Sequence, residues 1–252
     1  MISKNKYLYN YYNIKKYTNS YYRLTVFKVA VKNPGYEVEE VETKYKSEKS
    51  DKNDETDGKI DKSIIRARSR VFEYALCNEF DYFVTLTLDK NKMDRYNLDE
   101  FIKKFSQFIR DYRKKYKANI QYLLIPEKHK DGAWHMHGLI KGIPSEHLTL
   151  NKNGYKDWEA YAKKFGYISI DVIKNKEAVS KYITKYISKT FYGGGGVTEK
   201  NKKMYYASRG LKKAERIKEG TYYSCYQDSF DFENEYIKVK TVRNLEEISH
   251  LL

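Results

Sequence analysis

The sequence lacks the features that mark secreted and membrane proteins. It holds only two cysteines, Cys77 and Cys225, whose wide separation gives neither a metal-binding pattern nor a disulfide framework. No apolar run approaches the length of about 18 residues that a membrane span needs. The first residues, MISKNKYLYNYYNIKKY, also lack the apolar core of a signal peptide. We therefore expect no membrane span and a reducing, cytoplasmic environment.

Positive charge, by contrast, is abundant. The chain of 252 residues carries a formal net charge of +15, with 33% charged and 40% hydrophobic residues. This composition is typical of a globular protein with one large domain, or one domain with extensions. The surplus favours polyanions: DNA, RNA or an anionic membrane surface. However, the excess is mostly lysine, and a compositional bias of the genome would produce it without selection for binding.

Composition divides the chain into three segments. Residues 1–62 form an N-terminal extension that ends in a polar, charged linker over about residues 37–62. Residues 63–192 carry the regular patterns of a folded core. Residues 193–252 form a basic C-terminal extension that we expect to pack on the core.

Strand and helix patterns alternate along the core. They predict, in order, a strand over residues 81–89, a helix over 98–117, strands over 119–127 and 134–140, a short helix over 158–165, a strand over 167–173 and a helix over 176–191 that ends at the glycines 193–196. Outside this run, the patterns predict a strand over 21–30, a helix over 64–79 and an edge strand over 236–242. This order describes an α+β fold with a mainly antiparallel central sheet and flanking helices.

The segment GAWHMHGLI, residues 132–140, places two of the chain's five histidines one residue apart. On a strand, His135 and His137 share one face, and Met136 points the other way, into the core. Imidazole is a common ligand for transition-metal ions, so the pair predicts a metal site on a rigid support. The alternative is a pair of partly exposed strand histidines without a ligand, because short motifs give many false positives.

A candidate for a third ligand stands at the end of the preceding strand. If the loop between the two strands has an odd number of residues, Glu127 lies on the face of His135 and His137. Two imidazoles and a carboxylate leave coordination positions open for water or substrate. The same set is typical of zinc hydrolases and non-haem iron oxygenases, and Glu127 could instead be a solvated turn residue.

A second motif, KYITKYISK at residues 181–189, repeats Tyr-x-x-Lys. Tyr182 and Tyr186 share one face of the predicted helix, and Lys185 and Lys189 repeat the spacing. A tyrosine hydroxyl, with a pKa near ~10, is a weak nucleophile. A nearby cation favours its phenolate, and a metal polarises a phosphodiester for attack. The simpler interpretation is that both tyrosines extend a buried apolar stripe of the helix, formed by Val179, Ile183 and Ile187.

In this order, the motifs resemble those of the HUH endonuclease superfamily. FVTLTLD (Phe83–Asp89) is similar to its first motif, HMHGLI (His135–Ile140) to its second and YITKYISK (Tyr182–Lys189) to its third. The tandem tyrosines resemble the two-tyrosine rolling-circle replication initiators of small single-stranded DNA phages and plasmids. The basic segment SRGLKK (Ser208–Lys213) is similar to one in related phage initiators. The three main motifs span about residues 80–192.

The resemblance implies that His135, His137 and Glu127 bind a divalent metal ion, Mg²⁺ or Mn²⁺, which holds and polarises the scissile phosphate. Tyr182 or Tyr186 would attack, leaving a 5′-phosphotyrosine bond and a free 3′-hydroxyl for a polymerase. The other tyrosine would attack the regenerated origin after one round. Because the covalent bond conserves the phosphodiester energy, rejoining would need no ATP.

The resemblance also implies the contacts around this centre. Lys185 and Lys189 would steady the phosphate or the phenolate, and DNA contacts would come from Thr85, Thr87, Arg209, Lys212 and Lys213. The implied partner is single-stranded DNA at a replication origin, in the cytoplasm of a bacterial host. No helicase domain is visible, so we expect a host helicase and polymerase as further partners.

Two other function classes stay open. A zinc or iron enzyme of small molecules would use His135, His137 and Glu127, but it leaves the paired Tyr-x-x-Lys and the basic charge unexplained. A non-catalytic nucleic-acid-binding module with an RRM-like βαββαβ sheet fits the charge and the aromatic residues but gives the histidines no role. Within the superfamily, a relaxase or a transposase is a further alternative, against which the tandem tyrosines argue.

Overall fold

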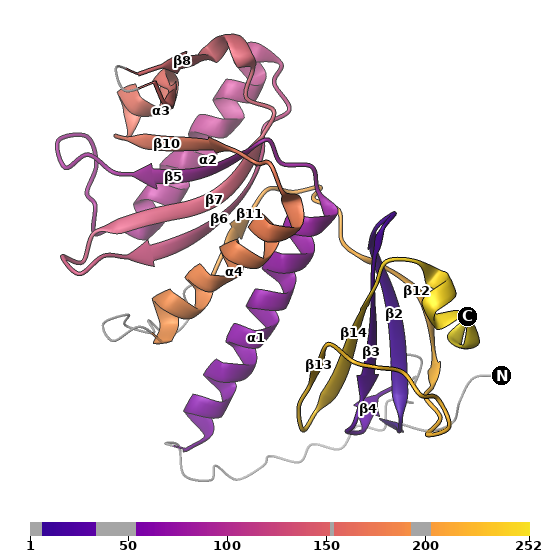
Figure 1. Ribbon diagram of the computed structural model, residues 1–252. Helices are drawn as coiled ribbons and strands as arrows, with labels where there is room; N and C mark the ends of the chain where they lie inside the picture. Colours follow the sequence, from indigo (N-terminus) through magenta and orange to yellow (C-terminus); the bar gives the residue numbers. More distant parts are fainter. Residues whose placement is uncertain (1–6, 34–53, 152–153, 193–202) are drawn as a thin grey trace, which may run out of the picture. The chain divides into compact units, whose positions relative to one another are not determined.

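The chain folds into two compact units. The computed structural model describes residues 7–33, 54–151, 154–192 and 203–252, with the backbone alone for 54–62 and 188–192 (Figure 1). Unit 1 combines residues 1–52 with residues 213–252, and unit 2 comprises residues 53–212. This division differs from the three consecutive segments expected from composition, because strands from the two ends of the chain pair with each other.

The sheet of unit 2 has seven strands. Their spatial order is β11 (Tyr206–Ala207), β6 (Gln121–Lys128), β7 (Trp134–Lys141), β5 (Tyr82–Thr87), β10 (Ile168–Val172), β9 (Lys156–Trp158) and β8 (Leu148–Leu150). All of its neighbouring pairs are antiparallel. The predicted α+β class is confirmed, and so is the predicted order of strands and helices in the core.

Three short elements interrupt that order between β7 and β10. They are the 3₁₀ helix η1 (Ser145–His147) and the three-residue strands β8 and β9, which precede helix α3 (Glu159–Lys164). Strands this short carry too few alternations for the period-two pattern to mark them, which is why sequence analysis missed them.

Helix α2 (Leu98–Tyr116) covers one face of the sheet. The side chain of Asn97 caps its first turn and accepts a hydrogen bond from the backbone N–H of Glu100 at 3.0 Å. Acidic residues in the first turn and basic residues in the last turn complement the helix dipole. Its apolar stripe packs into the main core with Val84 and Leu86 of β5, and consists of Leu98, Phe101, Phe105, Phe108, Ile109 and Tyr112.

Helices α1 (Asp54–Cys77) and α4 (Lys176–Tyr192) lie on the opposite face, where they pack against each other and over β6 (Figure 1). A second core joins Val71 of α1 and Ile183 of α4 to Ile125 of β6. No helix of the described residues is long and apolar enough to cross a membrane.

The start of α1 differs from the prediction. The helix begins at Asp54, inside the segment predicted as a linker, whereas sequence analysis began it at residue 64. A helix satisfies its backbone hydrogen bonds internally, so turns without apolar residues can still extend it. Residues 37–53 of the predicted linker and the glycines 193–196 lie outside the described residues.

Unit 1 is built around a five-stranded antiparallel sheet from both ends of the chain. The spatial order is β12 (Glu215–Thr221), β2 (Tyr11–Thr18), β3 (Tyr21–Phe27), β14 (Ile237–Val242) and β13 (Phe232–Glu233). The predicted strand over residues 21–30 is confirmed as β3. A separate pair joins β1 (Tyr7–Leu8) to β4 (Val31–Lys32).

The prediction of an edge strand over residues 236–242 is wrong. Strand β14 pairs with β3 along its whole length and with β13 on its other side. Alternation of apolar and polar residues identifies a half-buried strand but not its place in a sheet. The two-residue β13, which carries no such pattern, takes the edge instead.

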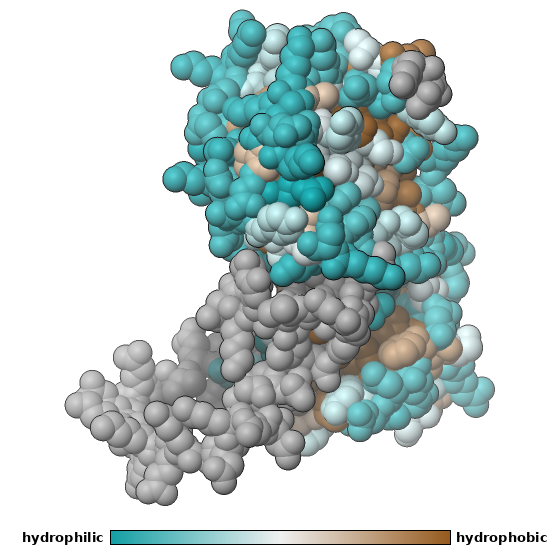
Figure 2. All heavy atoms as spheres, turned by 90° about the vertical axis from the view of Figure 1, so that its left-hand side faces the viewer, coloured by the Kyte–Doolittle hydropathy of each residue, from teal (hydrophilic) through white to brown (hydrophobic). Residues whose placement is uncertain are grey.

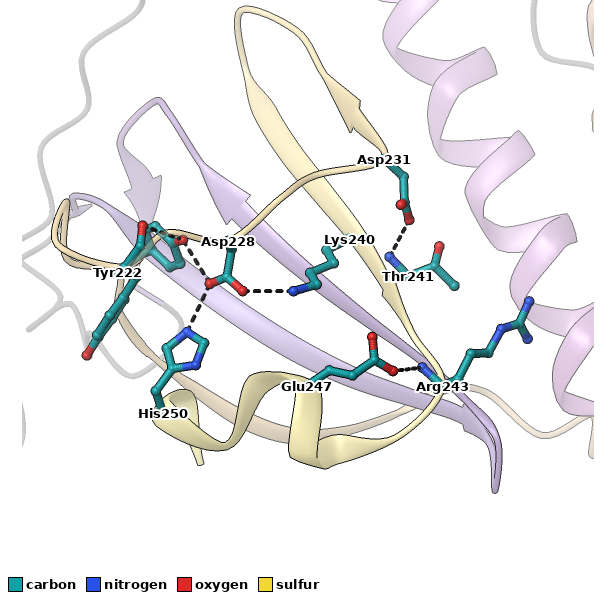
Figure 3. A network of polar contacts seen from close by, with 9 residues as sticks. Tyr222, Asp228, Asp231, Lys240, Thr241, Arg243, Glu247 and His250 are labelled. Atoms are coloured by element: carbon teal, nitrogen blue, oxygen red, sulfur yellow. Dashed lines mark hydrogen bonds and ion pairs between the residues drawn. The ribbon is translucent and has the colours of Figure 1, made fainter.

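A buried carboxylate ties unit 1 together (Figure 3). Asp228, whose side chain is only 2% exposed, accepts hydrogen bonds from Lys240 Nζ at 3.0 Å, His250 Nε2 at 2.9 Å and the Tyr222 hydroxyl at 2.9 Å. Burial alone raises the pKa of Asp228, but the hydrogen bonds from these three residues outweigh it and hold the pKa below its usual value. The carboxylate therefore links the loop after β12 to β14 and to the 3₁₀ helix η2 (Leu245–Leu251).

We predict that Asp228→Asn weakens unit 1. Loss of the buried charge leaves Lys240 without its partner, so protection of β14 amides against hydrogen exchange should fall by about 1–3 kcal/mol at pH 7. A lowered folded-state pKa stabilises the fold above about pH 4 and loses that effect as the pH falls through the folded pKa. The wild type should therefore lose this protection below about pH 4, and the variant should show no such loss.

The matched control is Glu246→Gln, which removes an exposed carboxylate from the same helix η2. Equal protection in Asp228→Asn and wild type across this range would show that the network does not stabilise unit 1.

Candidate active site

The β6–β7 hairpin brings the predicted ligands to one face. Its register pairs Glu127 with His135, and Ile125 with His137, so all four side chains point to the side covered by α4. The predicted placement of Glu127 on the histidine face is confirmed. The pairing of Lys128 with Trp134 leaves residues 129–133 as the connection, which has the odd length that this register needs.

The hairpin loop is held by its own polar groups. The side chain of Asp131 accepts a hydrogen bond from the Ala133 backbone N–H at 3.0 Å, and His129 exchanges backbone contacts with Gly132 and Ala133 at 2.9 Å. Gly132 has φ +84°, a conformation that residues with a side chain rarely adopt. The loop sequence thus fixes the register and, through it, the side on which the histidines lie.

Each histidine is oriented by a threonine on the neighbouring strand β5. Thr87 Oγ1 lies 3.2 Å from His135 Nδ1, and Thr85 Oγ1 lies 3.1 Å from His137 Nδ1. Both contacts leave the Nε2 atoms pointing away from β5. Sequence analysis proposed these threonines as DNA contacts. The structure places their hydroxyl groups against the histidines, an orienting arrangement typical of metal-binding imidazoles.

Glu127 and His137 are in direct contact. Glu127 Oε2 lies 2.5 Å from His137 Nε2, and both residues are buried. A buried carboxylate needs such a partner, because an isolated charge in the protein interior is costly.

His135 has a different neighbour, His129 in the hairpin loop. The two rings stack with centroids 3.8 Å apart and an angle of 10° between their planes. Burial lowers the pKa of His135, and the nearby His129 and His137 lower it further, against the opposing effect of Glu127 and Asp131. The neutral form, which a metal ligand requires, is therefore favoured. Sequence reasoning missed His129, although its place in the loop joining the two ligand strands was the available signal.

The donor chemistry fits a divalent cation, but the three groups are not assembled around one point. Across the described ranges, no group of three or more His, Cys, Asp or Glu side chains is arranged to hold a metal ion. Ligand atoms about 2.1 Å from a shared octahedral ion lie about 3 Å from each other. Binding would therefore require Glu127 and His137 to move apart by about half an ångström, and His135 to turn from His129 towards them.

Both predicted nucleophiles lie beside this cluster on α4. The hydroxyl oxygens of Tyr182 and Tyr186 are 2.8 Å apart, and the Tyr186 ring stacks on His137 at 3.9 Å. Phe83 of β5 packs against both tyrosine rings, at 5.6 Å and 6.3 Å, and so sets their position. The structure thus joins the His-x-His motif and the tyrosine motif into one site.

The two tyrosines differ in environment. Tyr182 is 45% exposed, whereas Tyr186 is partly buried against His137. Burial raises the pKa of Tyr186, and the hydrogen bond with Tyr182 and the charge of Glu127 raise it further. Tyr186 is therefore a neutral phenol at physiological pH.

The basic residues proposed for the site are only partly near it. Lys185 Nζ lies 5.6 Å from the centre of the Tyr182 ring, while the side chain of Lys189 lies outside the described residues. Arg209 and Lys212 follow β11, which pairs with the start of β6, roughly 20 Å from Glu127 at the strand's other end. Lys213 falls in unit 1.

Hydrophilic side chains dominate the surface of unit 2 where the β5–α2 and β6–β7 loops lie (Figure 2). This end of the sheet carries His135 and Glu127, so the site opens towards a polar surface. Polar, basic surroundings suit a charged, hydrated substrate better than an apolar small molecule.

Residues 81–191 match a family model of replication-associated proteins of the ORF2 type. The matched segment begins just before β5 and ends within α4, so it contains the threonines, the hairpin and both tyrosines. No curated protein and no solved structure matches the chain. The family match supports a replication-initiator family for this segment, and with it a role in DNA replication and DNA as a partner. Helix α1 and unit 1 lie outside the match.

We predict that Thr87 fixes the tautomer of His135. In the wild type, nitrogen-15 NMR of the imidazole should show the proton on Nδ1, where Thr87 accepts it, and a free lone pair on Nε2. Thr87→Val keeps the shape but removes a hydrogen bond worth about 1 kcal/mol, so the Nδ1–H population should fall about fivefold relative to Nε2–H.

Thr87→Ser, which retains the hydroxyl group, is the matched control and should preserve the wild-type spectrum. An unchanged tautomer in Thr87→Val would mean that the threonine does not orient the ring.

Proposed function

We propose that the protein is a rolling-circle replication initiator that nicks and rejoins single-stranded DNA at an origin through a 5′-phosphotyrosine intermediate. The observation that carries this proposal is the pair of tyrosine hydroxyls, 2.8 Å apart, packed on an imidazole that contacts a buried carboxylate. The match of the same segment to a replication-associated family supports the choice of substrate.

In the proposed reaction, one tyrosine oxygen attacks the scissile phosphorus. A new oxygen–phosphorus bond forms, the bond to the 3′ oxygen breaks, and the 3′ oxygen takes up a proton as it leaves. The attacking phenol loses its own proton during the step. The other hydroxyl, at hydrogen-bond distance, stabilises the resulting negative charge on oxygen.

His135, His137 and Glu127 would hold the divalent ion, Mg²⁺ or Mn²⁺. When bound, such an ion supplies positive charge that polarises the phosphate oxygens. Thr85 and Thr87 keep the histidine rings turned so that Nε2 faces the site. Lys185 and Lys189 would offset charge on the phosphate and the phenolate.

The tandem arrangement accounts for a second transfer. After Tyr182 or Tyr186 has become linked to the 5′ phosphate, the other hydroxyl remains beside it to attack the regenerated origin. Each transfer exchanges one oxygen–phosphorus bond for another, so no ATP is required. A polymerase would extend the free 3′-hydroxyl, and a host helicase would separate the strands.

A non-catalytic nucleic-acid-binding module is the second candidate. The direct contact between Glu127 and His137 favours it, because these groups satisfy each other without a metal ion. The experiments below separate the two functions by measuring covalent adducts and binding on the same DNA.

We predict that Tyr182→Phe combined with Tyr186→Phe abolishes covalent adduct formation. Loss of both nucleophiles should reduce single-turnover cleavage by more than about 10³-fold. Binding to the same oligonucleotides should stay within a factor of about two, since phenyl rings keep the packing against Phe83. The assay uses a pool of labelled single-stranded oligonucleotides with Mn²⁺ on a denaturing gel, and peptide mapping locates the linked residue.

The control is Tyr116→Phe, which removes the hydroxyl of an exposed tyrosine on α2. Wild-type cleavage by the double variant would rule out the phosphotyrosine mechanism. Binding without adducts in the wild-type protein would favour the binding module.

We predict that His135→Ala combined with His137→Ala removes the dependence of cleavage on divalent ions. The wild type should lose activity in EDTA and regain it with Mn²⁺ or Mg²⁺, as expected when a metal supplies several kcal/mol of transition-state stabilisation. The variant should be inactive under both conditions. His147→Ala, which changes a histidine paired with Tyr112 on the other face of the sheet, is the control. Metal-stimulated cleavage by the double variant would exclude these residues as ligands.

A further inference from the structure

Part of the sheet face beside the active site is uncovered. Helices α1 and α4 pack over β6 and β7 on this face, whereas the neighbouring strand β10 presents exposed side chains there. We call Tyr167, Ser169 and Asp171 the open strip. Tyr167 is 73% exposed, the highest value for a large apolar side chain in the described part of the chain.

Strand register places the open strip in line with the catalytic residues. Ser169 pairs with Thr85, which pairs with His137. In the next row, the backbone N–H of Thr87 donates to the carbonyl oxygen of Tyr167 at 2.8 Å, and Thr87 pairs with His135. Tyr167 therefore stands two strands from His135, at a backbone distance of about 10 Å.

The backbone of Tyr167 is firmly held. The preceding Gly166 has φ +144°, and a Cβ atom there would lie 2.5 Å from the Thr87 carbonyl oxygen and the Asp89 nitrogen. On its other side, Phe165 is fully buried, and its carbonyl oxygen accepts from the Asp89 N–H at 2.8 Å. Only glycine permits this close approach, and it turns the chain so that an anchored residue is followed by an exposed aromatic one.

A rigid aromatic ring facing solvent costs free energy unless something covers it. Packing explains Phe165 but not Tyr167, because the ring contributes little to either core of unit 2. Single-stranded nucleic acid covers such rings by stacking its bases on them, and a fixed ring loses little entropy when it does so. Most of the chain's surplus positive charge lies in residues 53–212, so this unit also attracts the phosphates.

We propose that Tyr167 is a stacking platform for a base of single-stranded DNA close to the scissile phosphate. Asp171 repels phosphates but accepts hydrogen bonds from the amino groups of adenine or cytosine, so bases rather than backbone face the open strip. The inference rests on the proposed function, because it takes single-stranded DNA as the ligand of this site.

The test uses the full chain carrying Tyr182→Phe and Tyr186→Phe, so that binding is measured without cleavage. In this background Tyr167→Ala should weaken binding to single-stranded oligonucleotides by about 5- to 150-fold, the range for loss of one stacked base. Tyr167→Phe and Tyr167→Trp should bind as tightly as the parent. The slope of log affinity against log salt should not change, because no phosphate contact is removed.

A second readout reports stacking directly. The fluorescence of 2-aminopurine, placed in turn along the oligonucleotide, should be quenched on binding at one position, and Tyr167→Ala should abolish that quenching. Tyr223→Ala, which removes an exposed tyrosine of unit 1, is the control and should change neither measurement. Circular dichroism establishes that each variant is folded.

The outcomes separate this inference from the proposed function. If Tyr167→Ala binds as tightly as the parent and leaves the quenching intact, the inference is wrong. Loss of self-association in sedimentation, with unchanged DNA binding, would also overturn it and would assign the ring to a protein contact. If the protein with both active-site tyrosines forms no adduct, yet binding depends on Tyr167, the nicking proposal fails and the stacking platform stands.

Discussion

The register of one hairpin determines which residues can act together. In β6 and β7, Glu127 and His135 are direct cross-strand neighbours, and β5 then supplies a threonine opposite each histidine. A shift of one residue would turn Glu127 to the face covered by α2, because side chains alternate along a strand. The buried carboxylate, the oriented imidazoles and the stacked tyrosine all depend on this pairing. The five-residue connection 129–133 therefore matters as much to the site as the residues that form it.

The helix that carries the tyrosines serves both folding and chemistry. One side of α4 places Ile183 and Ile187 in the second core, and the adjacent side brings Tyr182 and Tyr186 over His137 and Phe83. The simple interpretation of the tyrosines as part of a buried stripe is therefore partly right for Tyr186, whose ring is packed, but not for the largely exposed Tyr182. A side chain that packs on one edge and keeps its hydroxyl at the site is held in position at little entropic cost.

The sequence allowed much of unit 2 to be predicted, because its patterns are long and local. The alternation in β5, the apolar stripe of α2 and the shared face of His135 and His137 follow from strand and helix geometry alone. Contacts that depend on tertiary structure could not be found in this way. The pairing of Thr85 and Thr87 with histidine rings needs the β5–β7 register, and the stack of His129 on His135 needs the shape of the hairpin loop.

Unit 1 shows the same limit at the level of the domain. Strands β2 and β3 precede the core in sequence, while β12 and β14 follow it, and no local pattern indicates that they share a sheet. Pairs of such high sequence separation form slowly, since a long loop must close before they gain any contact. During synthesis, unit 2 has all of its strands before β14 leaves the ribosome, whereas β2 and β3 must wait for their partners. The order of folding along the chain is therefore reversed: the part made first becomes ordered last.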